Sequence, residues 1–108
     1  MTKAVGPKEL EHVLRLEGPR RYAYWIKQVA DWQLVWGLYS DGWALVSDDR
    51  GRQAIPVWPH ADFASACASG AWTGYAPRDI ELSAWMERWL PGMLADGKQV
   101  AVFPTPTD

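Results

Sequence analysis

The chain has 108 residues and a mass of 12.2 kDa, which suits one domain with its own hydrophobic core. Hydrophobic residues make up 48% and charged residues 22% of the sequence, so a largely disordered chain is excluded. The formal net charge of −2 argues against a dedicated nucleic-acid binder or a protein of anionic membrane surfaces, because both are usually basic. No apolar run approaches the ~20 residues of a membrane span, and residues 1–12 lack the apolar core of a signal peptide. We therefore expect a cytoplasmic protein.

Tryptophan is unusually abundant for so short a chain. The eight tryptophans lie at positions 25, 32, 36, 43, 58, 72, 85 and 89. An indole ring can bury on the order of 200 Å² and carries an N–H group that needs a partner once it is buried. The composition therefore predicts either a core built of tryptophan or a partly exposed aromatic surface.

Two amphipathic helices are predicted in the first third of the chain. Apolar spacing predicts a short helix over 7–16, and Gly18 marks its separation from a second helix over 19–32. The apolar face of the second helix consists of Tyr22, Trp25, Ile26, Val29 and Trp32. Such a stripe is typical of a helix that packs on a core. Arg20 and Arg21 are assigned to the opposite, solvated face.

Three short strands are predicted next, over 34–39, 43–47 and 53–58. These segments are rich in Val, Ile, Trp and Tyr, and turn residues separate them. Pro56 cannot donate a hydrogen bond to a neighbouring strand. The third strand is therefore expected at an edge of the sheet or at a bulge.

The Asp41-Gly42 pair predicts the register between the first two strands. This dipeptide is a strong signal for a two-residue hairpin turn. Such a turn would place Ser40 opposite Trp43. Trp36 and Trp43 would then share one face of the sheet, because side chains alternate along a strand.

The second half of the chain predicts two more helices and a last strand. A helix is expected over 60–69, followed by an irregular stretch over 71–78. The apolar stripe over 82–90 predicts a fourth helix, which Pro91 would break, with about one more turn after it. A strand over 99–103 completes the set.

The element order α-α-β-β-β-α-α-β predicts a single α+β domain over residues 1–108. Its expected architecture is an antiparallel three-stranded meander plus a C-terminal strand, packed with about four helices. Residues 1–6 and 104–108 are expected to be flexible or extended tails.

Three stretches of the chain, within 21–39, 42–60 and 89–106, carry a family resemblance. The first contains VWGLY, the second WPH and the third VAVFPTP. Together they resemble the bacterial family called domain of unknown function 2750, over about residues 20–106. This resemblance implies membership of a family with no established activity.

A more distant similarity rests on the helix start at Trp58-Pro59-His60 and on the glycine-led last strand that ends at Pro104. These features resemble the SseB-type domain. That resemblance implies a role in protein interaction.

Catalytic and metal-binding patterns are not evident. Cys67 and His60 lie about 10 Å apart along a helix, too far for a nucleophilic pair, and nothing points to His12 as a partner. Cys67 lies in an alanine-rich stretch and is expected to be an inert core residue. His60 is expected to begin a helix, with Asp62 favoured near its positive end. Two distant histidines and one cysteine do not have metal-ligand spacing, so we expect no metal, cofactor or catalytic residue.

A binding function is the main expectation. Trp58 and Trp72 flank irregular segments where exposure is expected, and with His60 and Tyr75 they are predicted to line a groove. We expect a non-catalytic accessory protein whose aromatic surface holds another protein or a second copy in a homodimer. The alternative is a small-molecule or peptide pocket, with or without enzymatic activity, that uses His60 with an acid supplied by the fold.

Overall fold

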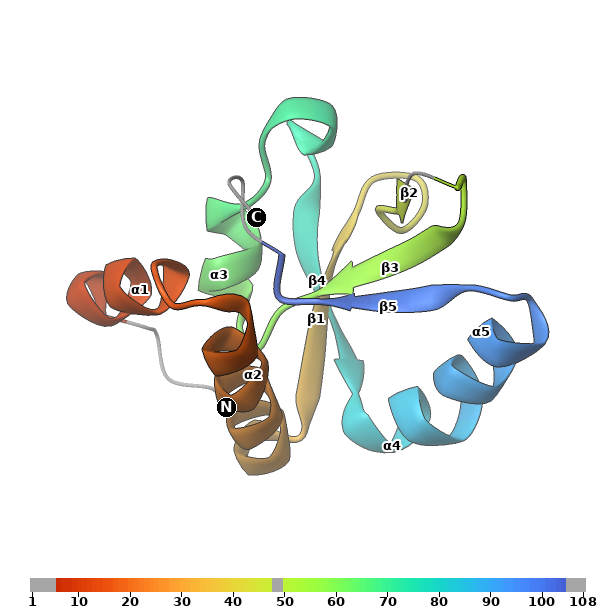
Figure 1. Ribbon diagram of the computed structural model, residues 1–108, viewed down its shortest axis with the longest axis horizontal. Helices are drawn as coiled ribbons and strands as arrows, with labels where there is room; N and C mark the ends of the chain where they lie inside the picture. Colours follow the sequence, from red (N-terminus) through yellow and green to blue (C-terminus); the bar gives the residue numbers. More distant parts are fainter. Residues whose placement is uncertain (1–5, 48–49, 105–108) are drawn as a thin grey trace.

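The computed structural model describes residues 6–47 and 50–104, and it has the expected α+β fold (Figure 1). In chain order the elements are α1 (Pro7–Leu14), α2 (Gly18–Trp32), β1 (Leu34–Tyr39), β2 (Val46–Ser47), β3 (Gln53–Val57), α3 (Ala61–Ala66), η1 (Gly70–Trp72), β4 (Ala76–Glu81), α4 (Leu82–Ala84), η2 (Trp85–Trp89), α5 (Leu90–Ala95) and β5 (Gln99–Val102). Apart from Gly6 and Pro104, the expected tails at 1–6 and 104–108 lie outside the described residues.

The strands form two small sheets, so the predicted three-stranded meander is wrong. β1 pairs antiparallel with β4, while β3 lies between β2, which is antiparallel to it, and β5, which is parallel. A bridge between Trp36 and Trp58 joins the two sheets through reciprocal backbone hydrogen bonds of 3.0 and 2.7 Å. The last strand, β5, thus lies beside β3. The strand β4, which was not predicted, lies beside β1.

The strand β4 begins within the stretch 71–78 that was expected to be irregular, and it takes the last three residues of that stretch. Of its six residues only Ile80 is buried, and Pro77 and charged residues occupy other positions. An edge strand of this kind pairs with one neighbouring strand, and most of its side chains are exposed to solvent. Its sequence therefore lacks the run of apolar residues that indicates a strand. Its assignment depends on pairing with β1, which local sequence does not show.

Pro56 lies in the middle strand of its sheet, opposite Ala101 of β5, so the predicted edge position of this strand is wrong. The neighbouring Val57 carbonyl faces β5 and accepts a hydrogen bond of 2.7 Å from the Phe103 N–H. Backbone groups alternate in direction along a strand, so the Pro56 nitrogen faces the other side. On that side β2 pairs only with Gln53 and Ala54. The missing N–H of Pro56 therefore costs no bond to β2.

The hairpin after β1 has a different register from the predicted one. Tyr39, not Ser40, forms the bridge with Trp43, so the loop is one residue longer. A shift of one residue moves a side chain to the other face of a sheet. The Trp43 ring lies over Gly37, on the face opposite to that of Trp36. The prediction that the two tryptophans share a face is therefore wrong.

The helical segment from Leu82 to Ala95 is continuous, so the predicted break at Pro91 is wrong. The π-helical turn η2 lies between α4 and α5, and the Leu90 N–H bonds to the Trp85 carbonyl five positions earlier. Proline cannot donate a bond and is tolerated in the first turn of a helix. Pro91 occupies such a position at the start of α5. The wider turn before it lets the chain continue in helical form.

The buried face of α2 keeps Trp25 and Val29 of the predicted stripe but is rotated toward Arg21. Tyr22 and Ile26 are 51% and 46% exposed, while Arg21 is only 6% exposed. The Arg21 Nε donates to the Phe103 carbonyl at 3.1 Å and Nη1 donates to the Leu16 carbonyl at 2.5 Å. Arg21 therefore fixes the end of β5 against α1 and α2. Its predicted place on a solvated face is wrong.

The core lies where α1, α2 and α3 meet the strands on one side, while α4 and α5 lie at the other end of the molecule (Figure 1). Trp58, Phe63 and Phe103 are fully buried there. The rings of Phe63 and Phe103 meet edge to face, with centroids 5.1 Å apart. Burial of large aromatic rings supplies most of the stabilisation in a domain of this size.

Candidate binding groove

The expected exposure of Trp58 is wrong, because this residue has 0% exposed surface. Its Nε1 donates a hydrogen bond of 3.0 Å to the Pro104 carbonyl. Trp72 is half-buried and packs edge to face on Trp58, with ring centroids 5.8 Å apart, and Tyr75 is half-buried nearby in sequence. Trp58 and Trp72 are thus brought together as packing partners in and around the core.

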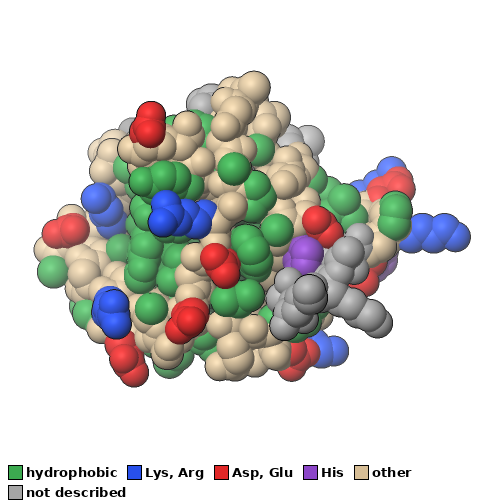
Figure 2. Space-filling model, turned by 180° about the vertical axis from the view of Figure 1, so that it is seen from behind, with side chains coloured by type: hydrophobic (Ala, Val, Ile, Leu, Met, Phe, Trp, Pro, Cys, Tyr) green, Lys and Arg blue, Asp and Glu red, His purple; other side chains and the backbone are tan. Residues whose placement is uncertain are grey.

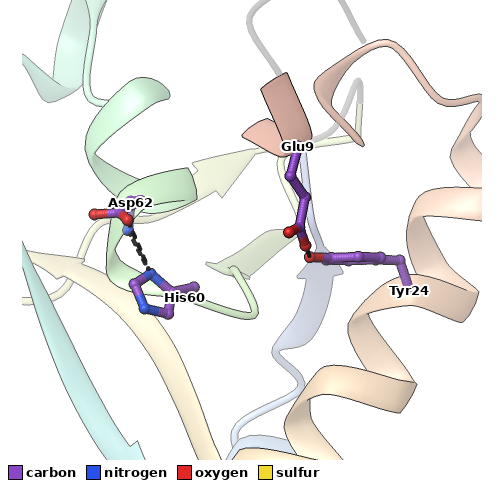
Figure 3. Close-up of polar contacts among 4 residues, drawn as sticks. All are labelled: Glu9, Tyr24, His60 and Asp62. Atoms are coloured by element: carbon purple, nitrogen blue, oxygen red, sulfur yellow. Dashed lines mark hydrogen bonds and ion pairs between the residues drawn. The ribbon is translucent and has the colours of Figure 1, made fainter. Parts of the chain in front are cut away.

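His60 begins α3, as predicted. Its Nδ1 accepts a hydrogen bond of 3.0 Å from the Asp62 backbone N–H, and Figure 3 shows the ring turned toward this group. The ring packs against Trp32 and Trp36, and only 5% of the residue is exposed. The Asp62 carboxylate lies 3.6 Å from Nδ1. This geometry gives His60 a capping and packing role.

Figure 3 also shows a contact between the first two helices. The Tyr24 hydroxyl in α2 donates a hydrogen bond of 2.6 Å to Glu9 Oε2 in α1. Burial and the neighbouring Glu9 carboxylate raise the pKa of Tyr24 above its ordinary value. The contact ties α1 to the rest of the fold and presents no reactive group.

Cys67 is buried at the end of α3, in agreement with the expected core position. Burial raises the pKa of its thiol, although a hydrogen bond with Trp58 and the charge of Arg21 act in the opposite direction. A raised pKa keeps the thiol protonated and a poor nucleophile. Within residues 6–47 and 50–104 no three His, Cys, Asp or Glu side chains gather as metal ligands do. In the same residues no helix has the length and hydropathy to cross a membrane.

A groove of about 470 Å³ lies between the helical segment η2–α5 and the residues around β2 and β3. We call it the Trp43–Trp89 groove. Its lining residues are Trp43, Leu45, Ile55, Arg88, Trp89, Gly92, Met93, Asp96 and Lys98. The volume is within the range of small ligand sites, and an apolar lining with a few charged groups is typical of them. None of the four predicted site residues lines it.

Two tryptophan rings form one wall of the groove. Trp43 and Trp89 meet edge to face, with centroids 5.0 Å apart and an angle of 89° between the rings. The buried Trp85 stacks on Trp89 from within the fold, at 5.8 Å. A Cβ atom at Gly37 would lie 3.0 Å from two carbons of the Trp43 ring. The absence of a side chain at Gly37 therefore allows Trp43 to lie close against β1.

Basic groups lie beside this wall. Arg88 and Lys98 line the groove together with one carboxylate, that of Asp96. In the part of the chain that the structure describes, no carboxylate lies within 4 Å of either cation. The Arg78 guanidinium lies over the Tyr39 ring at 4.4 Å and near the Trp43 ring at 5.7 Å. The groove therefore combines an apolar floor with an excess of positive charge.

Sequence reasoning gave Trp89 and the groove no role in binding. The apolar stripe over 82–90 gave no signal for the groove, because apolar residues three and four positions apart are the ordinary pattern of a helix that packs on a core. Trp85 is buried, Trp89 is half-buried, and Met86 and Leu90 are exposed. On the rear face of the molecule apolar side chains gather among charged ones (Figure 2).

The family model described as "Protein of unknown function (DUF2750)" matches residues 22–108. The chain belongs to this family. The predicted resemblance over about residues 20–106 is thereby confirmed, and the DUF2750 match includes every residue that lines the Trp43–Trp89 groove. The comparisons give no support to the more distant similarity to SseB-type domains. No curated protein and no solved structure matches the chain.

Proposed function

We propose that the protein is a non-catalytic binding module of the bacterial cytoplasm that holds an apolar segment of another protein in the Trp43–Trp89 groove. The observation that carries this proposal is the open, apolar hollow with two tryptophans in its wall. Aromatic side chains in a concave site give a large contact area at a low cost in conformational entropy. They are frequent among the residues that dominate binding energy.

The surroundings of the groove support a preformed site. Trp89 is held by the buried Trp85, and Trp43 is held against β1 over Gly37. Side chains that are fixed before binding lose little freedom when a ligand arrives, and this raises affinity. The charged residues at the groove restrict the orientation in which an apolar segment can bind.

The proposal is tested with an acetylated and amidated pentapeptide that has phenylalanine at its centre and glutamine at the other positions. Heteronuclear NMR of the labelled protein should show shifts of the Trp43 and Trp89 indole signals on titration. Leu45→Ser should weaken binding about fivefold, because it removes roughly 1 kcal/mol of apolar contact. Leu45 is partly exposed, so this change leaves the fold intact.

The matched control is Leu94→Ser in α5. Leu94 is 82% exposed and does not line the groove. It should leave peptide affinity unchanged. The proposal is rejected if the shifts map to another surface, or if Leu94→Ser weakens binding as much as Leu45→Ser does.

A further inference from the structure

We infer that the segment bound in the Trp43–Trp89 groove is acidic, with an apolar residue between two carboxylates. This inference rests on the proposed function and adds the charge of the partner. The apolar side chain would contact the two tryptophans. The carboxylates would pair with Arg88 at one end and Lys98 at the other.

The charge balance of the groove differs from that of the whole chain. The chain has a net charge of −2, yet the groove is lined by two cations and one carboxylate. Arg78 adds a third positive group beside the Trp43 ring. A basic site on an acidic protein attracts acidic partners and disfavours basic ones, because opposite potentials complement each other across an interface.

The positions of the two cations are compatible with a short extended partner. Arg88 lies in η2, and Lys98 follows α5, where its backbone N–H bonds to the Met93 carbonyl at 2.9 Å. The chain thus folds back after α5 and places Lys98 beside Met93, five positions after Arg88, which is about 7–8 Å at a helical rise. The long stems of arginine and lysine carry the charged groups further from the backbone. An extended pentapeptide spans ~13 Å between its end residues, so one with acidic ends and an apolar centre is long enough to reach both charges.

Asp96 also lines the groove and works against this preference. Its carboxylate is close in sequence to Lys98, and no ion pair within 4 Å joins the two. A partner carboxylate at the Lys98 end would meet some repulsion from Asp96. Asp96→Asn should therefore strengthen the binding of an acidic peptide about two- to threefold.

The test compares three blocked pentapeptides, with the sequences Glu-Gln-Phe-Gln-Glu, Gln-Gln-Phe-Gln-Gln and Lys-Gln-Phe-Gln-Lys. Their affinities are measured by NMR titration at low and at high salt. The acidic peptide should bind about three- to tenfold more tightly than the neutral one at low salt, and the basic peptide should bind most weakly. High salt should reduce these differences, because exposed charges are screened.

Arg88→Gln and Lys98→Gln should each remove part of the preference for the acidic peptide. Both should weaken the acidic peptide more than the neutral one, so the ratio of the two affinities falls. Arg20→Gln is the matched control, since Arg20 is an exposed cation of α2 that does not line the groove. It should change nothing.

The possible failures are distinct. If the neutral or the basic peptide binds as tightly as the acidic one, the acidic partner is refuted while the groove keeps its proposed function. If Arg20→Gln weakens the acidic peptide as much as Arg88→Gln does, the preference comes from overall charge, and the inference is again overturned. If no peptide binds, both the inference and the proposed function are rejected.

Discussion

Replacing Trp58 by alanine tests the conclusion that this ring belongs to the core. The residue is fully buried, and its Nε1 donates to the Pro104 carbonyl. Burial of on the order of 200 Å² at ~25 cal/mol per Å² gives an upper value of about 5 kcal/mol. Truncations of buried aromatic residues cost about 3–5 kcal/mol, and the lost hydrogen bond adds ~1 kcal/mol. We expect Trp58→Ala to lower the free energy of unfolding by about 4–5 kcal/mol.

Urea denaturation followed by far-ultraviolet circular dichroism measures this loss. A domain of this kind has ~5–15 kcal/mol of stability, so the alanine variant can be largely unfolded. Trp58→Phe then supplies the measurement, because it keeps most of the ring and leaves the Pro104 carbonyl without its donor. It should cost about 1–3 kcal/mol. A loss below ~1.5 kcal/mol for Trp58→Ala would refute the core assignment and return Trp58 to the surface.

Three further outcomes are expected. Gly37→Ala should destabilise the protein by about 1–3 kcal/mol and shift the Trp43 indole signal, because the alanine methyl group would displace the Trp43 ring. An unchanged NMR spectrum would contradict this expectation. Arg21→Lys should cost about 2–3 kcal/mol in urea denaturation, since lysine cannot donate to two carbonyls in a fixed fork, whereas Arg20→Lys at the exposed neighbouring position should stay within ~0.5 kcal/mol. Burial raises the pKa of the Cys67 thiol in the folded protein. The protonated thiol therefore contributes fully to the free energy of unfolding below about pH 8.5, the pKa in the unfolded chain, and this contribution is lost as the pH rises toward the pKa in the folded protein. Above pH ~8.5 the free energy of unfolding of the wild type should therefore fall relative to that of Cys67→Ala. A difference between the two proteins that stays constant across the alkaline range would contradict the raised pKa.

Features set by local spacing were predictable from the sequence. The bounds of α1 and α2 agree with the predicted helices to within two residues, because helical periodicity and the glycine and proline between the helices are local signals. The start of α3 at His60 was predictable for the same reason. The family resemblance also rests on contiguous stretches, and the family match confirms it.

Features set by distant contacts were not predictable. The face of α2 that is buried includes Arg21, because the carbonyl of Phe103, 82 positions away, needs a donor there. A hairpin one residue longer than expected reversed the face of Trp43. The pairing of β1 with β4 is likewise invisible to local patterning.

The groove illustrates the same limit for function. Its lining comes from the loop before β2, from β3, from η2 and α5, and from the turn before β5. Pattern analysis gave Trp89, on a helical stripe, no role in binding. It predicted that Trp58 is exposed because this residue flanks an irregular segment. In both cases the deciding factor was which segment packs against the ring.

The parallel pairing of β3 with β5 also has a consequence for synthesis of the protein. β3 ends at Val57 and β5 begins at Gln99, so the ribosome must make the whole segment between them before this pair can form. Closure of long loops slows folding, and nascent chains with unpaired strands expose sites for aggregation. Arg21 finds its acceptor, the Phe103 carbonyl, only when Phe103 has left the exit tunnel. Folding of this small domain is therefore completed only after β5 has been synthesised, and a chain stalled before β5 is a natural substrate for chaperones and proteases.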